Sequence, residues 1–167
     1  MDGFCGVKYA GERYDRVYFG KARRTGLQRS RGLGRYGIAV AKNFAPLTEQ
    51  GVNQIQETIE VLREEKAQII LSSPFTRCMQ GACMMSKELG LDVKVEHGLY
   101  EWQLDKTHSV RAKLREKILL WQFNHRKWNR FCKWEHPDTV KERVLKVFDK
   151  YLSYDKVIVS CHAMMIL

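Results

Sequence analysis

The sequence predicts an α/β fold, a three-layer α/β/α sandwich built around a mostly parallel sheet. Short apolar segments typical of buried strands alternate along the chain with longer segments whose apolar residues recur at helical spacing. Strands that are joined by helices usually pair in parallel and are covered on both faces. The length of 167 residues is enough for one domain with a hydrophobic core and short for two. We therefore expect one domain over residues 1–167.

The first half of the chain contributes three expected strands and two expected helices. A short apolar run at 17–19 is a candidate first strand, and from residue 47 the pattern becomes regular. "LTEQG" opens a helix whose apolar face is repeated every three or four residues, and "REEK" closes it. "AQIILSS" is a buried strand that stops at Pro74, followed by a helix over 76–89 that ends at Gly90. "LDVKVE" alternates with a period of two and predicts another strand.

The second half adds two expected helices and a last strand. Residues 109–131 are rich in basic and aromatic side chains and look helical, within an expected helical insertion over 103–135. "HPDTVKERVLKVFDKYL" is an amphipathic helix with Val140, Val144, Val147 and Tyr151 on one side. "KVIVS" is then an apolar strand.

The net charge of +10 is concentrated at one end of the chain. Residues 1–42 carry ten Lys and Arg against three acids, so this basic, irregular N-terminal region supplies most of the excess. A basic arm can grip nucleic-acid phosphates, and the segment "WQFNHRKWNRFCKW" could stack bases. A solvated tail and a helix packed on the sheet explain the same residues. Nucleic acid is therefore the weaker alternative for a partner.

Cysteine usage and hydropathy favour a cytoplasmic protein. The five cysteines are odd in number and include no Cys-x-x-Cys pair, which argues against a disulfide framework and against a zinc site. The first residues have no apolar signal region, and no apolar run approaches the length of a membrane span. We expect no membrane partner, and the oligomeric state is left open.

Three chemically capable residues follow the ends of predicted strands. Arg77 lies in the first turn of the helix after "IILSS", His162 follows "VIVS", and Glu101 follows the "LDVKVE" strand in "GLYEW". Ligands of such sheets bind beyond the carboxyl ends of the strands. A guanidinium, an imidazole and an acid are what phosphoryl transfer needs. Each residue alone has a duller explanation: a solvated arginine, a hydrogen-bonded core histidine or a surface carboxylate.

Four segments in this order resemble the histidine phosphatase family, which has the phosphoglycerate-mutase-like fold. They are "APLTEQGVNQ", "SSPFTRCMQGA", "GLYEW" and "VIVSCHAMMI", and "WEHPDTVKERV" is similar to some bacterial members. The resemblance implies a phosphohistidine mechanism on a small phosphorylated metabolite, without a metal or another cofactor. It implies that Arg77 binds the phosphoryl oxygens and that Glu101 protonates the leaving group. It also implies that His162 is the second histidine of the site, with a role both in catalysis and in phosphate binding.

The sequence departs from the family where the nucleophile belongs. The family places its first histidine in an Arg-His-Gly motif after the first strand, whereas the histidines here are at 97, 108, 125, 136 and 162. "YAGERYD" at 9–15 is one weak remnant of that motif. A local frame displacement is the alternative: residues 21–29 can be encoded so that the frame one base later reads Arg-His-Gly-Glu-Pro-Asp-Tyr-Ser.

These departures lead to three hypotheses on function. The first is a phosphomonoesterase or mutase whose activity is impaired in this copy. The second is a phosphate-binding pseudoenzyme, and the third and weakest is a nucleic-acid-binding module. The family pattern continues with a further helix and strand beyond the last strand, so the fold is also expected to be clipped after residue 167.

Overall fold

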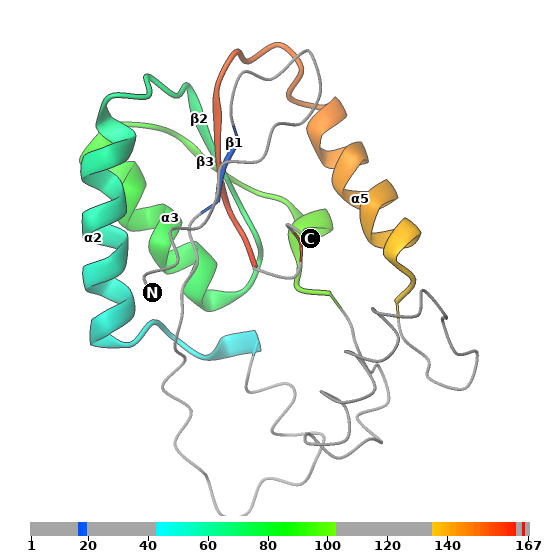
Figure 1. The fold of residues 1–167 in the computed structure, drawn as a ribbon, viewed down its shortest axis with the longest axis horizontal. Coiled ribbons are helices and arrows are strands. Elements are labelled where there is room, and N and C mark those ends of the chain that lie inside the picture. Colours follow the sequence, from blue (N-terminus) through cyan, green and yellow to red (C-terminus); the bar gives the residue numbers. More distant parts are fainter. Residues whose placement is uncertain (1–16, 20–42, 103–134, 163–164, 166–167) are drawn as a thin grey trace, which may run out of the picture.

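The computed structural model describes the backbone of residues 17–19, residues 43–102 and 135–162, and Met165. The expected helix over 109–131 and nearly all of the basic region 1–42 lie outside the described residues. The described part has strands on the inside and helices on the outside, as Figure 1 shows. Among the described residues, no helix is both long and apolar enough to cross a membrane.

The sheet has four strands in the order β1-β4-β2-β3. They are β1 (Val17–Phe19), β2 (Ile69–Ser72), β3 (Val93–Val95) and β4 (Val157–Ser160). Every pairing between them is parallel. This confirms the predicted α/β fold with a parallel sheet and places β2 and β4 at its centre. Since the strands are parallel, their carboxyl ends all reach the same edge of the sheet.

Helices cover both faces of this sheet. Helices α2 (Glu49–Arg63) and α3 (Thr76–Leu89) lie on one side, and α5 (Pro137–Asp149) lies on the other (Figure 1). Alternate residues of β2 face the two layers: Ile70 packs with the α2 and α3 side chains, whereas Ile69 and Leu71 pack with those of α5. The period of two in a central strand thus separates two apolar cores, as a sheet buried on both faces requires.

The helix ends follow local chemistry. The Thr48 side chain accepts a hydrogen bond from the Gly51 N–H and caps α2. Gly90 ends α3 with a left-handed φ of 70°, a conformation that glycine adopts without steric cost. Pro137 stands in the first turn of α5, where its missing N–H would have no intrahelical partner. The predicted bounds of α3, residues 76–89, are confirmed.

Strand β3 differs from its prediction. The alternation in "LDVKVE" predicts a half-buried strand over six residues, but the strand comprises Val93–Val95, and Val95 is 53% exposed. The physical reason is position: β3 pairs with β2 and forms one edge of the described sheet, so no strand beyond it covers Val95. A short 3-10 helix, η1 (His97–Leu99), follows β3 and contacts α5.

Candidate phosphate-binding site

The three predicted site residues converge at the carboxyl edge of the sheet. Ser72 of β2 is in register with Ser160 of β4, so the residues that follow these two strands leave the sheet side by side. His162 comes two residues after β4, and Arg77 is the second residue of α3, which follows β2 after a short turn. Glu101 reaches the same place from the loop after η1. The topology therefore brings together residues that are up to 85 positions apart.

Arg77, Glu101 and His162 form one contact group. The Arg77 Nη2 atom lies 2.8 Å from His162 Nδ1. One carboxylate oxygen of Glu101, Oε2, is 3.5 Å from the same nitrogen and 3.9 Å from Arg77 Nη2. The side chain of His162 is 2% exposed, that of Arg77 13% and that of Glu101 29%. The histidine is thus the floor of the group and the glutamate is its most accessible member.

The contacts of His162 fix its tautomer. A guanidinium can only donate hydrogen bonds, so Nδ1 must accept from Arg77 with its lone pair. The proton of the neutral ring is then on Nε2, which lies 2.8 Å from the Ser73 hydroxyl oxygen and donates to it. The Phe75 ring packs against the imidazole with 4.9 Å between ring centroids. The imidazole is therefore held on two nitrogens and one face.

This tautomer argues against a serine hydrolase arrangement. Ser73, His162 and Glu101 are close enough to suggest a serine–histidine–acid triad. In such a triad the acid orients a protonated Nδ1, and Nε2 takes the serine proton. Here Nδ1 accepts from Arg77 and Nε2 carries the proton, so His162 cannot act as a base toward Ser73.

Burial and positive charge keep His162 neutral. Burial lowers the pKa of the imidazole most, and the guanidinium groups of Arg77 and Arg143 lower it further, to about 3. A neutral imidazole carries no charge that would attract an anion, and its one proton, on Nε2, is donated to the Ser73 hydroxyl. The positive field at the site therefore comes from the arginines.

The pKa of the Glu101 carboxyl is raised, so this group keeps its proton to a higher pH than an ordinary glutamate. Burial raises the pKa of its carboxyl, while a hydrogen bond from the Trp102 N–H and the charges of Arg77 and Arg143 oppose that effect without cancelling it. A carboxyl with a raised pKa retains its proton to higher pH and is a better proton donor to a leaving oxygen. This is the electrostatic behaviour that the role expected of Glu101 requires.

Two residues at this edge were missed by the sequence analysis. Glu135 is a buried carboxylate, and Arg143 of α5 forms two hydrogen bonds to it, from Nε at 2.8 Å and from Nη2 at 3.1 Å. Both belong to the quoted segment "WEHPDTVKERV". The available signal for their pairing was the spacing of eight residues between this glutamate and this arginine. An arginine on the apolar side of a predicted helix pattern could have drawn attention to a buried ion pair.

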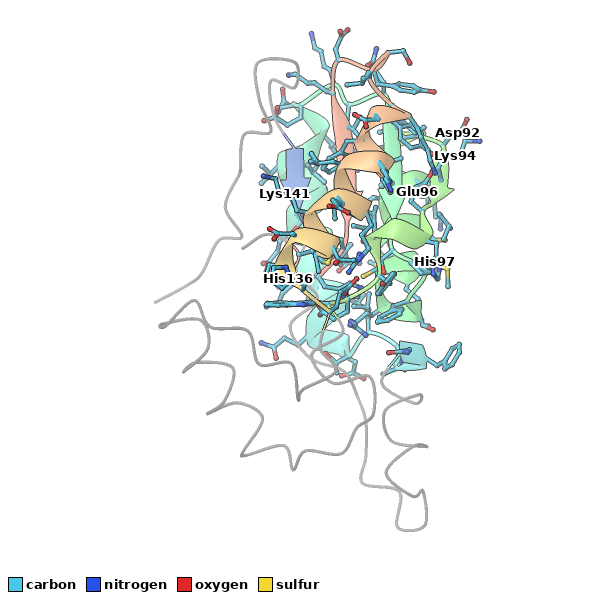
Figure 2. The ribbon with its side chains drawn as sticks, turned by 90° about the vertical axis from the view of Figure 1, so that its right-hand side faces the viewer. Asp92, Lys94, Glu96, His97, His136 and Lys141 are labelled. Atoms are coloured by element: carbon cyan, nitrogen blue, oxygen red, sulfur yellow. The ribbon has the colours of Figure 1, made fainter. Side chains whose placement is uncertain are left out.

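The other described histidines make different contacts. His136 caps the start of α5, where its Nδ1 accepts from the Asp138 N–H. His97, the first residue of η1, packs on the ring of Tyr100. Figure 2 shows both on the face that carries α5 and η1. In the described ranges, no group of three or more His, Cys, Asp or Glu could hold a metal ion. Among the described residues, His162 is the histidine that contacts Arg77 and Glu101.

The group is chemically suited to an oxyanion. Arg77 offers a planar set of N–H donors that matches the oxygens of a phosphoryl group. The Nε2–H of His162 is engaged by Ser73 and can serve an oxyanion by exchanging that acceptor, and Glu101 adds a carboxyl that can hold a proton. These functions are complementary for binding a phosphomonoester and for protonating its leaving oxygen.

The comparisons with known proteins agree on one family. The model of the histidine phosphatase superfamily (branch 1) matches residues 35–167. No curated protein sequence matches the chain.

Three solved structures illustrate the similarity of fold. A mycobacterial glucosyl-3-phosphoglycerate phosphatase in complex with inorganic phosphate is 18% identical, with a TM-score of 0.65 over 90% of this chain and 73% of that chain. The structure named mycobacterial hydrolase 1 is 18% identical, with a TM-score of 0.64 over 90% and 75%. An alpha-ribazole phosphatase from Shigella flexneri is 15% identical, with a TM-score of 0.62 over 90% and 75%.

Proposed function

The chain belongs to the histidine phosphatase superfamily, branch 1, and from that premise we propose that its Arg77–Glu101–His162 group binds the phosphoryl group of a small phosphorylated metabolite. We further propose that hydrolysis or transfer of that phosphoryl group is impaired in this copy. Solved proteins of similar fold include phosphatases named for glucosyl-3-phosphoglycerate and for alpha-ribazole, which are small molecules, and one of them contains inorganic phosphate. The proposal extends the substrate class of these proteins to this chain, not their particular substrates.

One observation carries the binding proposal. Arg77 and His162 present an N–H fork and an imidazole within 2.8 Å of each other at the carboxyl edge of the sheet. In open α/β sheets this edge is where ligands bind. A phosphoryl group placed beside this pair would take charge-assisted hydrogen bonds from Arg77, which are among the stronger hydrogen bonds in proteins.

In a catalytically complete site, each residue would have a distinct task. Arg77 and His162 would stabilise the equatorial oxygens as charge builds up during in-line attack. Glu101, whose pKa is raised by burial, would protonate the leaving oxygen. A histidine nucleophile would form the covalent phosphoryl intermediate. The first three groups are present, and impaired turnover follows because no histidine precedes residue 97.

The end of β1 is the position in the fold from which a nucleophile could reach the site. Strand β1 pairs in parallel with β4, with Phe19 in register with Val159, so β1 ends at the same edge as His162. The residues after Phe19 are those in which we propose a displaced reading frame. The family match starting at residue 35, after this stretch, supports a displacement that closes near residues 30–32. Sequencing the coding DNA over residues 19–32 tests it: a shifted frame that does not read Arg-His-Gly removes the idea.

Binding and turnover are tested separately on the protein as it is. Titration calorimetry with inorganic phosphate and with vanadate should show saturable binding to the wild type and weak or no binding to Arg77→Gln. Arg63→Gln is the matched control, because Arg63 is a half-exposed arginine of α2 that pairs with Glu88 outside the site. Equal binding by all three proteins would contradict the assignment of Arg77.

A generic aryl phosphate distinguishes the impaired enzyme from a pseudoenzyme. Phosphate binding with no measurable hydrolysis supports the pseudoenzyme, which is the second candidate. Slow hydrolysis that disappears in His162→Gln supports the impaired enzyme, whereas rapid hydrolysis that disappears in the same variant contradicts the proposal that turnover is impaired. Hydrolysis that persists in His162→Gln at the same rate comes from elsewhere and removes His162 from the mechanism.

A further inference from the structure

We infer that Glu135 and Arg143 are positioning residues that hold Glu101 against the Arg77–His162 pair. They lie on either side of the start of α5 and bond to the loop that carries Glu101. The consequence for phosphoryl chemistry rests on the proposed function, whereas the positional claim does not. Glu135 and Arg143 together with Gly98, Tyr100 and Trp102 are called the α5 clamp below.

The clamp grips the loop at alternate residues. Arg143 Nη1 donates to the Gly98 carbonyl, and the Arg143 guanidinium lies over the Tyr100 ring at 3.7 Å from its centroid. The Tyr100 hydroxyl donates to Glu135 Oε1 at 2.8 Å. The clamp therefore fixes both the backbone and a side chain of the segment just before Glu101.

The same carboxylate residue also fixes the other side of Glu101. The Trp102 indole N–H donates to the Glu135 carbonyl oxygen at 2.8 Å, and Trp102 as a whole is 6% exposed. Tyr100 and Trp102 thus both bond to Glu135, while Glu101 between them contacts Arg77 and His162 instead. Neighbouring side chains of an extended segment point in opposite directions. Anchoring residues 100 and 102 on α5 therefore directs Glu101 toward the site.

The loop leaves little free space against α5. A Cβ atom added to Gly98 would lie 2.6 Å from Val147 Cγ2 and 2.9 Å from the Arg143 carbonyl oxygen. Backbone and helix are therefore in direct contact at this position. The ion pair at the centre of the clamp is itself buried, with side-chain exposures of 13% for Arg143 and 2% for Glu135. Buried ion pairs add little net stability, because the loss of hydration offsets the attraction between the charges. We therefore attribute the Glu135–Arg143 pair to positioning of the loop and not to stabilisation of the fold.

The test measures the pKa of the Glu101 carboxyl by carbon NMR in the wild type and in Arg143→Met. Burial raises the pKa of Glu101 above the ordinary 4.5. The positive charges of Arg77 and Arg143 act in the opposite direction and lower it. If Arg143 acted only as a nearby charge, its removal would raise the pKa of Glu101 further. If Arg143 positions Glu101, the released carboxyl becomes solvated and its pKa falls toward 4.5, which is the expected result. A rise, or no change, overturns the inference.

Two further variants keep the test decisive. Tyr100→Phe retains the ring that Arg143 covers and removes only the hydrogen bond to Glu135, so it decides the question if Arg143→Met does not fold. Its Glu101 pKa should also fall, by less than in Arg143→Met, and an unchanged value contradicts the clamp. Val140→Ala, a buried substitution on the same helix outside the clamp, should leave the pKa unchanged.

Phosphate titration of the same samples separates this inference from the proposed function. A wild type that does not bind phosphate removes the proposed function but leaves the pKa comparison between variants intact. A wild type that binds phosphate while Arg143→Met shows a raised or unchanged Glu101 pKa removes the clamp alone.

Discussion

Arg77 donates a hydrogen bond of 2.8 Å to Nδ1 of His162, and this contact fixes the tautomer of the buried imidazole. It fixes the ring proton on Nε2 and keeps a positive charge next to a neutral imidazole. The pair joins the first turn of α3 to the residue two positions after β4. Everything proposed for the site depends on this relationship.

The first prediction concerns the tautomer of His162. Nitrogen NMR at neutral pH should show Nδ1 without a proton and Nε2 with one, because Arg77 can only donate to Nδ1. Ser73→Ala removes the acceptor of the Nε2 proton and should shift the Nε2 resonance while Nδ1 stays unprotonated. A protonated Nδ1 in the folded wild type would contradict the assignment.

The second prediction is a pH effect on stability. The pKa of His162 is about 3 in the folded protein and near 6.5 in the unfolded chain, so the unfolded chain binds the extra proton between these values. The free energy of unfolding should therefore fall as the pH decreases from about 6.5 toward 3. Denaturant unfolding of the wild type and of His162→Gln isolates this contribution, since other groups titrate equally in both. A difference between the two proteins that does not depend on pH would be evidence against a neutral, buried His162.

The third prediction concerns Gly98. Gly98→Ala should lower the free energy of unfolding by about 1–3 kcal/mol, because its methyl group would overlap with Val147 and with the Arg143 backbone. Gly51→Ala is the contrasting control: its Cβ would meet the flexible Leu47 side chain at 3.3 Å, and alanine favours a helix by up to about 1 kcal/mol over glycine. Thermal or denaturant unfolding measures both. Equal effects would mean that the loop does not pack on α5 as described.

The fourth prediction concerns thiol reactivity. Burial raises the pKa of the Cys78 thiol to about 12, and the Arg77 charge and hydrogen bonds only partly oppose this. Cys78 lies 3.7 Å from His162 Nε2 but should remain an unreactive thiol at neutral pH. Exposed Cys83 should be alkylated rapidly in the folded protein, and buried Cys78 and Cys161 only after unfolding. Mass spectrometry of peptides after timed alkylation resolves the three; fast labelling of Cys78 would contradict its burial.

The sequence allowed prediction of the central part of the fold because periodicity reports burial directly. Strands β2 and β4 are short apolar runs between clear helices, and they proved to be buried on both faces. Strand β3 was less well predicted, because alternation cannot reveal that a strand lies at an edge. Whether Val95 is covered depends on strand order, which only long-range pairing decides.

The site was predictable where it follows from topology. Arg77 and His162 could be placed together because the carboxyl ends of parallel strands meet at one edge. Glu135 and Arg143 could not, because their role depends on how α5 docks on a loop 45 residues away from Arg143. Their side chains contact the loop through hydrogen bonds and ring stacking, which leave no periodic signal in the sequence.

The most direct test of the central claim is a phosphate titration followed by NMR at the His162 ring. A bound dianion offsets the arginine charges, so the pKa of His162 should rise from about 3 and its resonances should shift and saturate. Removing a charge-assisted hydrogen bond of about 1.5–3 kcal/mol in Arg77→Gln should weaken binding roughly 10- to 100-fold. Resonances of His162 that do not move in the folded wild type, or that move equally in Arg77→Gln, would show that this group is not a phosphate site.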